Sequence, residues 1–280
     1  MPNPRSVLFF FLDGLGIGPP DPAVNPFLTA KLPTLSRLLD DAVPVLNGRG
    51  DVVPFSLGAS SAKDTGEFPS GDSHIRLAPL DALMGMDGLP QSGTGHTALF
   101  TGENAAALYG RHFGPWVPVP LRPLMMEGNI LSRAQAEGFS CIFANAYPSQ
   151  FIHRAWTKRP AGPPLAAKGA GLLTRTEKHL GVGEAVSSEM VNRAWRTRLA
   201  LTHLPEISLG EAGLNLASIA SGADLTLFAH YSTDTAGHEK TLRAGVAALE
   251  RVDAFLAGVL SALDPDCLLV LASDHGNIED

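Results

Sequence analysis

The chain has 280 residues, which is enough for one large domain or for a core with a small insert. Its net charge of −7 and its lack of a basic run argue against nucleic acid as a partner. No run approaches the roughly 18 apolar residues of a membrane span, and the first apolar run is too short for a signal peptide. We therefore expect a cytoplasmic protein without a membrane partner, in which Cys141 and Cys267 are buried core thiols.

Short apolar runs alternate along the chain with helical patterns. Residues 7–12 (VLFFFL) are apolar throughout, which is typical of a strand inside a parallel sheet. Helices are expected where Pro or a capping residue precedes a periodic apolar stretch. This alternation predicts an α/β fold, with a mostly parallel central sheet and helices on both faces. The expected strands are 7–12, 75–80, 140–144, 224–230 and 268–272, and the expected helices are 33–39, 98–109, 129–138, 208–222 and 242–263.

Two regions depart from this alternation. Residues 44–73 are rich in Gly, Pro, Ser and Asp, and we expect long loops there. Residues 148–205 carry more Arg and Lys and two glycine clusters, and residues 186–204 have an amphipathic helical pattern. We interpret 148–205 as a small helical insert or cap, set into a catalytic core formed by residues 1–147 and 206–280.

The first strand ends at Asp13, which is followed by GLGIGPP. This segment is not a dinucleotide fingerprint, because Pro19 occupies the third glycine position and Pro20 follows, so no helix can begin there to meet a pyrophosphate. A carboxylate at a strand end, with glycines that allow close approach, suits a metal ligand better.

Two later strands also end in acidic and imidazole groups. Asp234 and His238 follow residues 224–230, and Asp274 and His275 follow residues 268–272. The carboxyl ends of parallel strands meet at one edge of a sheet, where α/β proteins bind ligands. Carboxylates and imidazoles without Cys suit Mn²⁺, Zn²⁺ or Mg²⁺, and these four groups together with Asp13 make five, which is enough for two ions. Such ions would also give an acidic enzyme the positive charge that an anionic substrate needs.

Hydroxyl groups gather where a helix is expected to begin. Ser92, Thr94 and Thr97 lie in the stretch SGTGHT, where backbone N–H groups and the helix dipole favour an anion. The same side chains could equally be plain helix caps. A serine that touches a metal ion loses its proton more easily, which makes Ser92 a candidate nucleophile.

Four motifs occur in the order seen in the alkaline phosphatase superfamily. They are DGLG at 13–16 with the downstream NPF and KLPTL, SGTGH at 92–96, DTAGH at 234–238 and SDHGN at 273–277. The chain most resembles the branch of cofactor-independent phosphoglycerate mutase and phosphopentomutase. This resemblance implies a two-metal phosphotransfer enzyme, a phosphomutase or phosphohydrolase, that uses two divalent ions (Mn or Zn, with Mg as the alternative) on a small phosphorylated metabolite.

The resemblance also implies a role for individual residues. Asp13, Ser92, Asp274 and His275 match the ligands of one metal, and Ser92 matches the nucleophile that becomes phosphorylated. Asp234 and His238 match two ligands of the other metal. The His96 position is a scaffold position in the family, so we do not expect a ligand there. Thr94 is the backup nucleophile. Asn104, Arg111 and His112 could contact substrate or lie in a solvated loop, and His74, His153, His179 and His203 have no assigned role.

Two departures from the family leave alternatives open. The family completes its second metal site with a His beyond the DHGN motif, past Asp280, so we expect either a further C-terminal segment or an incomplete second site. The mutases also carry a larger cap than residues 148–205, which favours transfer to water. The alternatives are a phosphodiesterase-like or sulfatase-like hydrolase, and a non-catalytic protein with a degenerate site. The oligomeric state is not predicted.

Overall fold

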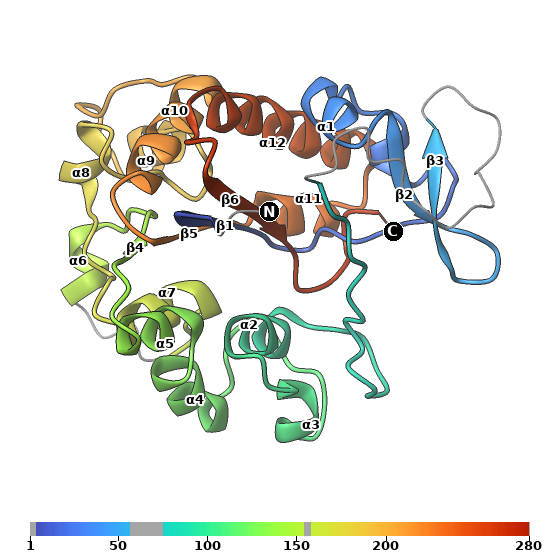
Figure 1. The fold of residues 1–280 in the computed structure, drawn as a ribbon, viewed down its shortest axis with the longest axis horizontal. Coiled ribbons are helices and arrows are strands. Elements are labelled where there is room, and N and C mark those ends of the chain that lie inside the picture. Colours follow the sequence, from blue (N-terminus) through green and yellow to red (C-terminus); the bar gives the residue numbers. More distant parts are fainter. Residues whose placement is uncertain (1–3, 57–74, 154–157, 280) are drawn as a thin grey trace.

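The computed structural model describes residues 4–56, 75–153 and 158–279. Within these ranges, four strands form one sheet in the order β4 (Cys141–Phe143), β5 (Leu225–His230), β1 (Ser6–Leu12) and β6 (Cys267–Ala272). Every pair in this sheet is parallel, and Phe10 of β1 lies in register with Phe228 on one side and Leu271 on the other. The predicted α/β class is therefore confirmed, and β1, β5 and β6 all end at the same edge (Figure 1).

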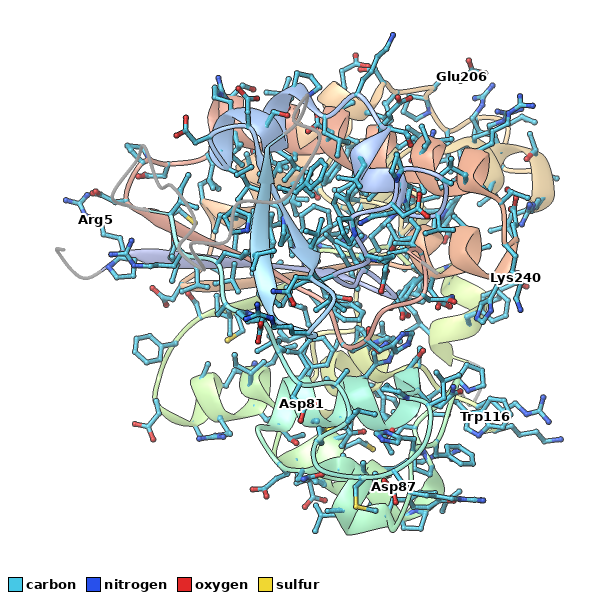
Figure 2. The ribbon with its side chains drawn as sticks, turned by 90° about the vertical axis from the view of Figure 1, so that its right-hand side faces the viewer. Arg5, Asp81, Asp87, Trp116, Glu206 and Lys240 are labelled. Atoms are coloured by element: carbon cyan, nitrogen blue, oxygen red, sulfur yellow. The ribbon has the colours of Figure 1, made fainter. Side chains whose placement is uncertain are left out.

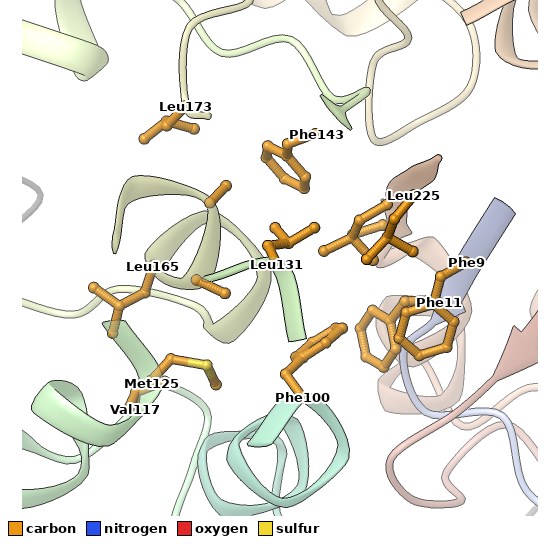
Figure 3. Packing of buried hydrophobic residues seen from close by; sticks show 14 of the residues in the cluster. Phe9, Phe11, Phe100, Val117, Met125, Leu131, Phe143, Leu165, Leu173 and Leu225 are labelled. Carbon is orange, nitrogen blue, oxygen red and sulfur yellow. The ribbon is translucent and has the colours of Figure 1, made fainter. Parts of the chain in front are cut away.

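Helices cover both faces of the sheet because the side chains of β1 alternate between them. Phe9 and Phe11 pack with Phe100 into one apolar cluster, in which the rings meet edge to face (Figure 3). Leu8 and Phe10 belong to a second cluster on the opposite face. The first cluster is covered by α2 (Ser92–Thr101), α4 (Arg122–Glu127), α5 (Ile130–Ala136) and α7 (Gly162–Gly169), and the second by α10 (Leu209–Ala220) and α12 (Leu242–Ala262).

Several helices begin where their capping residues predict. The side chain of Asn129 accepts hydrogen bonds at the start of α5, and Ser208 and Glu211 form a reciprocal capping box at the start of α10. Asp253, buried in α12, accepts from the backbone N–H groups at the start of α1 (Pro33–Leu38). The shorter elements are η1 (Pro26–Leu28), α3 (Ala105–Tyr109), η2 (Val119–Leu121), α6 (Ser149–His153), α8 (Glu177–Gly181), α9 (Arg193–Arg198) and α11 (Ser232–His238).

The region between α1 and α2 differs from the expectation. Residues 75–80 form no strand. An antiparallel hairpin, β2 (Ala42–Leu46) and β3 (Val52–Ser56), lies within the stretch that we expected to be mostly loop. The hairpin was not predicted because Pro44 and Pro54 argue against strands. Each proline lies on a strand with a free edge, where a missing N–H is tolerated. Residues 57–74, which include His74, lie outside the described part of the chain. Figure 2 shows Asp81 and Asp87 of the following segment at the surface below the hairpin.

The predicted helix at 186–204 is wrong, because only α9 is helical there. Val186 instead forms a bridge to Asn145 that prolongs the edge of the sheet, and Met190 adopts a positive φ of 70°. The predicted helix at 98–109 is two helices. Gly102, at φ 76°, ends α2, which begins six residues earlier than expected at Ser92.

The division into a core and an insert stays a prediction, although α7 of the insert contacts both α2 and α4. Cys141 and Cys267 are free thiols that are half-buried rather than buried in the core. In the described part of the chain, no helix reaches the length and apolarity that crossing a bilayer requires.

Candidate metal centre

Five side chains from three separate motifs converge at the carboxyl edge of the sheet. Asp13 follows β1, Asp274 and His275 follow β6, and Ser92 and His96 lie on the first turns of α2. We call these five residues the inner cluster. All are buried, and the most exposed of them, His275, retains only 9% of its accessible surface. The parallel register brings the strand ends together, which is why motifs more than 250 residues apart in sequence meet here.

Ser92 and His275 are joined directly. The Ser92 Oγ lies 3.0 Å from Nε2 of His275. The other ring nitrogen, Nδ1, lies 3.0 Å from the carbonyl oxygen of Gly276. Because a carbonyl only accepts, Nδ1 carries the proton and Nε2 presents a lone pair. Nε2 of His275 can therefore accept the Ser92 hydroxyl proton in a hydrogen bond or bind a metal ion.

Two carboxylate oxygens lie close to this nitrogen. Nε2 of His275 lies 3.4 Å from Asp274 Oδ2 and 3.6 Å from Asp13 Oδ1. Both of these carboxylate oxygens are buried, and neither has a hydrogen-bond partner in the described part of the chain. Buried lone pairs that face one another are unfavourable unless a cation lies between them. Two carboxylates and an imidazole form a ligand set that suits Mn²⁺, Zn²⁺ or Mg²⁺, so the residues present fit a divalent ion.

The carboxylates of the inner cluster have opposite pKa shifts. Burial raises the pKa of Asp274 to about 6, despite the opposing effect of His96, and the charge of Asp13 adds to the rise. Burial also raises the pKa of Asp13, but His96 and His275 outweigh it, so the net pKa lies below the usual value. Two neighbouring carboxylates whose pKa values are driven apart in this way are typical of a functional site.

His96 lies between the two carboxylates, a placement that the sequence did not predict. Its Nε2 lies 3.2 Å from Asp13 Oδ2 and 3.3 Å from Asp274 Oδ2, and the Phe11 ring packs nearly perpendicular to the imidazole ring. Burial lowers its pKa, whereas the charges of Asp274 and Asp13 raise it, with a net rise. One signal was present, because His96 follows Ser92 by four residues and therefore shares its face of α2.

Asp234 and His238 form what we call the outer pair, at the two ends of α11. Nε2 of His238 lies 3.4 Å from Asp234 Oδ2, but the His238 side chain is 71% exposed. The side-chain amide of Asn277 donates to Asp234 Oδ1 at 2.8 Å. Asp234 faces the inner cluster, because one ligand atom each from Asp13, Asp234 and His275 lies within 4.8 Å of the others. A second grouping at that spacing consists of Asp13, His96 and Asp274.

The loops that carry these residues are fastened to one another. The Ser273 Oγ accepts from the N–H of Leu15 at 2.9 Å, and Glu279 Oε2 accepts from the N–H of Gly16 at 2.9 Å. Gly14 has a φ of 69°, and a Cβ there would lie 2.8 Å from the Cα of Asp234. The glycines after Asp13 thus permit the close approach that the sequence suggested, whereas the buried Glu279 had no sequence signal.

The remaining expected residues lie in other surroundings. The Thr94 hydroxyl is buried and bonds to backbone groups of Gln91 and Phe113, while Thr97 bonds to the carbonyl of Gly93. Asn104 caps α3 beyond the far end of α2, and its amide donates to Met84. At about 1.5 Å per residue, α2 separates it from Ser92 by roughly 15 Å.

Two other expected substrate contacts and one histidine, His179, have local partners. His112 lies 3.3 Å from the carbonyl of Met86, and the exposed Arg111 approaches the ring of Tyr109. Their contact with substrate stays a prediction. His179 belongs to the capping box of α8, and His203 is exposed.

The comparisons with known proteins concern the C-terminal part most directly. A family model described as the metalloenzyme superfamily matches residues 214–280, the segment that carries Asp234, His238, Asp274 and His275. No curated protein matches the chain. A solved structure of the PH0037 protein from Pyrococcus horikoshii is similar with a TM-score of 0.45 and 12% identity, over 99% of this chain and 81% of that one. The carboxyl edge of the sheet therefore carries, in residues 214–280, a sequence similar to the metalloenzyme superfamily.

Proposed function

We propose that the chain is a metal-dependent phosphotransfer enzyme that acts on small phosphate esters, with Ser92 as its nucleophile. The observation that carries this proposal is the position of the Ser92 Oγ, 3.0 Å from His275 Nε2 and beside two buried carboxylates with unpaired oxygens. A nucleophile held against a set of metal-binding atoms is the arrangement that metal-assisted phosphoryl transfer needs.

The chain's own residues divide between two ion positions. Asp13, Asp274, His275 and the Ser92 Oγ would hold one ion, and Asp234 and His238 would contribute to the other. When bound, the ions neutralise the buried carboxylates, lower the pKa of the serine hydroxyl and draw charge from phosphoryl oxygens. Mn²⁺ or Zn²⁺ suits this mixed oxygen and nitrogen set best, and Mg²⁺ is the alternative.

The start of α2 offers a place for the phosphoryl group. Among the described residues, the backbone N–H groups of Ser92 and Gly93 have no acceptor, whereas the N–H of Thr94 donates to the carbonyl oxygen of Phe113. Gly93 packs so closely on the Trp116 carbonyl that a Cβ would lie 2.1 Å from it, which fixes the direction of this first turn. Two free donors and the helix dipole at the nucleophile would stabilise the equatorial oxygens of a phosphoryl group.

The test is hydrolysis of an aryl phosphate by the purified chain with Mn²⁺ or Zn²⁺. Ser92→Ala should lower kcat by about 10⁴-fold or more, because removal of a nucleophile leaves only binding and electrostatic effects. Thr94→Val is the matched control, since it removes a hydroxyl from the same helix turn. Full activity of Ser92→Ala, or its loss in Thr94→Val alone with the fold intact, would refute the assignment of Ser92.

A panel of substrates separates the reactions that the same site could perform. Phosphomonoesters, phosphodiesters and sulfate esters would be offered at equal concentration, together with a sugar phosphate whose isomerisation reports mutase activity. We expect phosphomonoester hydrolysis to be fastest. Mass spectrometry of the Ser92 peptide should detect one added phosphoryl group after rapid quenching, since the reaction passes through the serine.

A further inference from the structure

His96 is in contact with both carboxylates of the inner cluster, and its distances alone would admit it as a metal ligand. Its Nε2 lies 3.2 Å from Asp13 Oδ2 and 3.3 Å from Asp274 Oδ2. Whether it binds an ion or serves the carboxylates depends on which ring nitrogen carries the proton, because a protonated nitrogen has no lone pair to offer.

The insert determines the position of that proton. The backbone N–H of Gly162, the first residue of α7, lies 3.2 Å from Nδ1 of His96 and donates to it. A backbone N–H is always a donor, so Nδ1 must present its lone pair. In the neutral ring the proton then lies on Nε2. This is the opposite tautomer to that of His275, whose Nδ1 faces the Gly276 carbonyl.

We propose that His96 is a positioning residue that donates from Nε2 to the two carboxylates and is not a metal ligand. Its two nearly equal distances place the N–H between Asp13 Oδ2 and Asp274 Oδ2, so that the proton is shared and is well aligned with neither oxygen. The inference rests on the proposed function, because it assumes that these carboxylates bind an ion. It assigns His96 the role of holding them at the right separation.

The packing around His96 allows this single arrangement. The side chain is 1% exposed, and the Phe11 ring packs against it nearly perpendicularly at a centroid distance of 5.0 Å. A Cβ at Gly162 would lie 2.3 Å from the Cβ of His96, so the backbone can reach Nδ1 only because residue 162 has no side chain. The insert therefore takes part in the centre through one glycine, from a segment far from every metal motif in the sequence.

The direct test is the tautomer of each ring, measured by long-range proton–nitrogen NMR on the full chain with ¹⁵N-labelled histidine. Without metal, the His96 ring should show the proton on Nε2 and the His275 ring should show it on Nδ1. On addition of Zn²⁺, the Nε2 signal of His275 should shift while His96 keeps its Nε2 proton. A His96 ring with the proton on Nδ1, or one that loses its Nε2 proton to Zn²⁺, would overturn the inference.

The two rings separate this inference from the proposed function. If Zn²⁺ leaves the His275 signals unchanged, the metal centre itself is refuted, whatever the state of His96. If His275 responds and His96 also binds Zn²⁺, only the positioning role is refuted. The His96 signals are assigned by their disappearance in His96→Gln.

Variants give a second measurement. In Mn²⁺ titrations, His96→Ala should weaken binding by about 10- to 100-fold, the usual effect of removing a group that orients a ligand. His96→Gln should recover most of this loss, because its side-chain amide can place a donor near the position of Nε2. Equal losses in the two variants, both folded, would contradict a role that depends on the donor.

Two glycines of α7 provide a matched pair for the insert. Gly162→Ala displaces His96. Gly169→Ala, also in α7, creates a clash of the same kind with Met126 of α4, whose carbonyl oxygen would lie 2.0 Å from the new Cβ. We expect Gly162→Ala to weaken Mn²⁺ binding by about 10-fold. Gly169→Ala should lower thermal stability and leave Mn²⁺ affinity within about twofold. Equal losses of affinity in both would show that α7 packing alone, and not the Gly162 contact, matters.

Discussion

The inner cluster and the outer pair use the same residue types in different surroundings. Asp13, Asp274 and His275 are at most 9% exposed, and each of the two carboxylates directs toward His275 an oxygen that has no hydrogen-bond partner among the described residues. His238 of the outer pair is largely exposed, and Asp234 is held chiefly by the amide of Asn277. The fold has therefore fixed one set of ligand atoms before any ion binds, whereas the other set must still be ordered. Ordering side chains costs conformational entropy, so we expect the inner cluster to bind its ion more tightly.

Removal of a buried carboxylate charge should cause the largest loss of metal affinity at the inner cluster. Asp274→Asn preserves the shape of the side chain but removes one of the two charges that face the proposed ion. We expect the tighter Mn²⁺ site to weaken by more than about 100-fold, beyond the effect of changing an orienting neighbour. Calorimetric titration measures the loss. Asp264→Asn, an exposed change just before β6, should leave the affinity intact, and normal binding by Asp274→Asn would contradict the assignment.

In the metal-free chain, the free energy of unfolding should depend on pH through the carboxylates of the inner cluster, and this is the second-largest expected effect. The pKa of Asp274 rises from 3.8 to about 6 in the folded state, chiefly through burial. The folded state then holds the proton more tightly than the unfolded state, so this group's contribution to the free energy of unfolding falls as pH rises from about 4 to about 6. Asp13, whose pKa is lowered, acts with the opposite sign below its usual value of 3.8.

Bound Mn²⁺ should reverse the way in which Asp274 makes stability depend on pH, because the ion binds the deprotonated carboxylate. Below pH 6, its affinity should fall by about tenfold per pH unit if one proton is displaced. The difference in Tm with and without Mn²⁺ should therefore be larger at pH 7 than at pH 5. In Asp274→Asn this dependence should be lost, and a Tm difference that does not change with pH in the unaltered chain would count against the proposal.

The outer pair should respond less strongly to substitution. His238→Ala should weaken the second Mn²⁺ by about 10-fold and leave the first within about twofold, because the His238 side chain pairs with Asp234 and is mostly solvated. Titration by electron paramagnetic resonance distinguishes the two ions by their stoichiometry. His203→Ala serves as the exposed control. If His238→Ala abolishes both ions, the two positions are not separable in the way that burial indicates.

Substitution of Asn277 should cause the smallest loss of metal affinity. Asn277 follows the inner-cluster residue His275 by two positions and holds Asp234 of the outer pair. Its amide donates to the side chain and to the carbonyl of Asp234, at 2.8 and 3.1 Å. Asn277→Ala removes about 1 kcal/mol of hydrogen bonding and should weaken the second Mn²⁺ by about fivefold. Competition with a metal-sensitive dye measures this difference. An unchanged second affinity would mean that Asp234 is positioned by the packing of α11 on the loop after Asp13 alone.

The sequence predicted the strands that carry the centre because each is a short apolar run with a polar residue directly after it. Residues 7–12, 224–230 and 268–272 became β1, β5 and β6 with ends within one or two positions. The apolar run at 75–80 was also predicted to be a strand, but it forms none. The hairpin at 42–56 was not predicted, because each of its strands contains a proline. The helix predicted from the amphipathic pattern at 186–204 was also wrong over most of its length, because Val186 bridges to Asn145 at the sheet edge and does not form a helical turn.

The sequence by itself determined which residue types could form the centre and that they follow three strands and begin one helix, because strand ends and caps are local features. Only the tertiary structure decided how exposed each group is, which oxygens lack partners, and that Gly162 reaches His96. Burial and hydrogen-bond partners arise from contacts between segments far apart in the chain, and no local pattern encodes them. The contrast between the buried inner cluster and the solvated outer pair is therefore a property of the packed molecule.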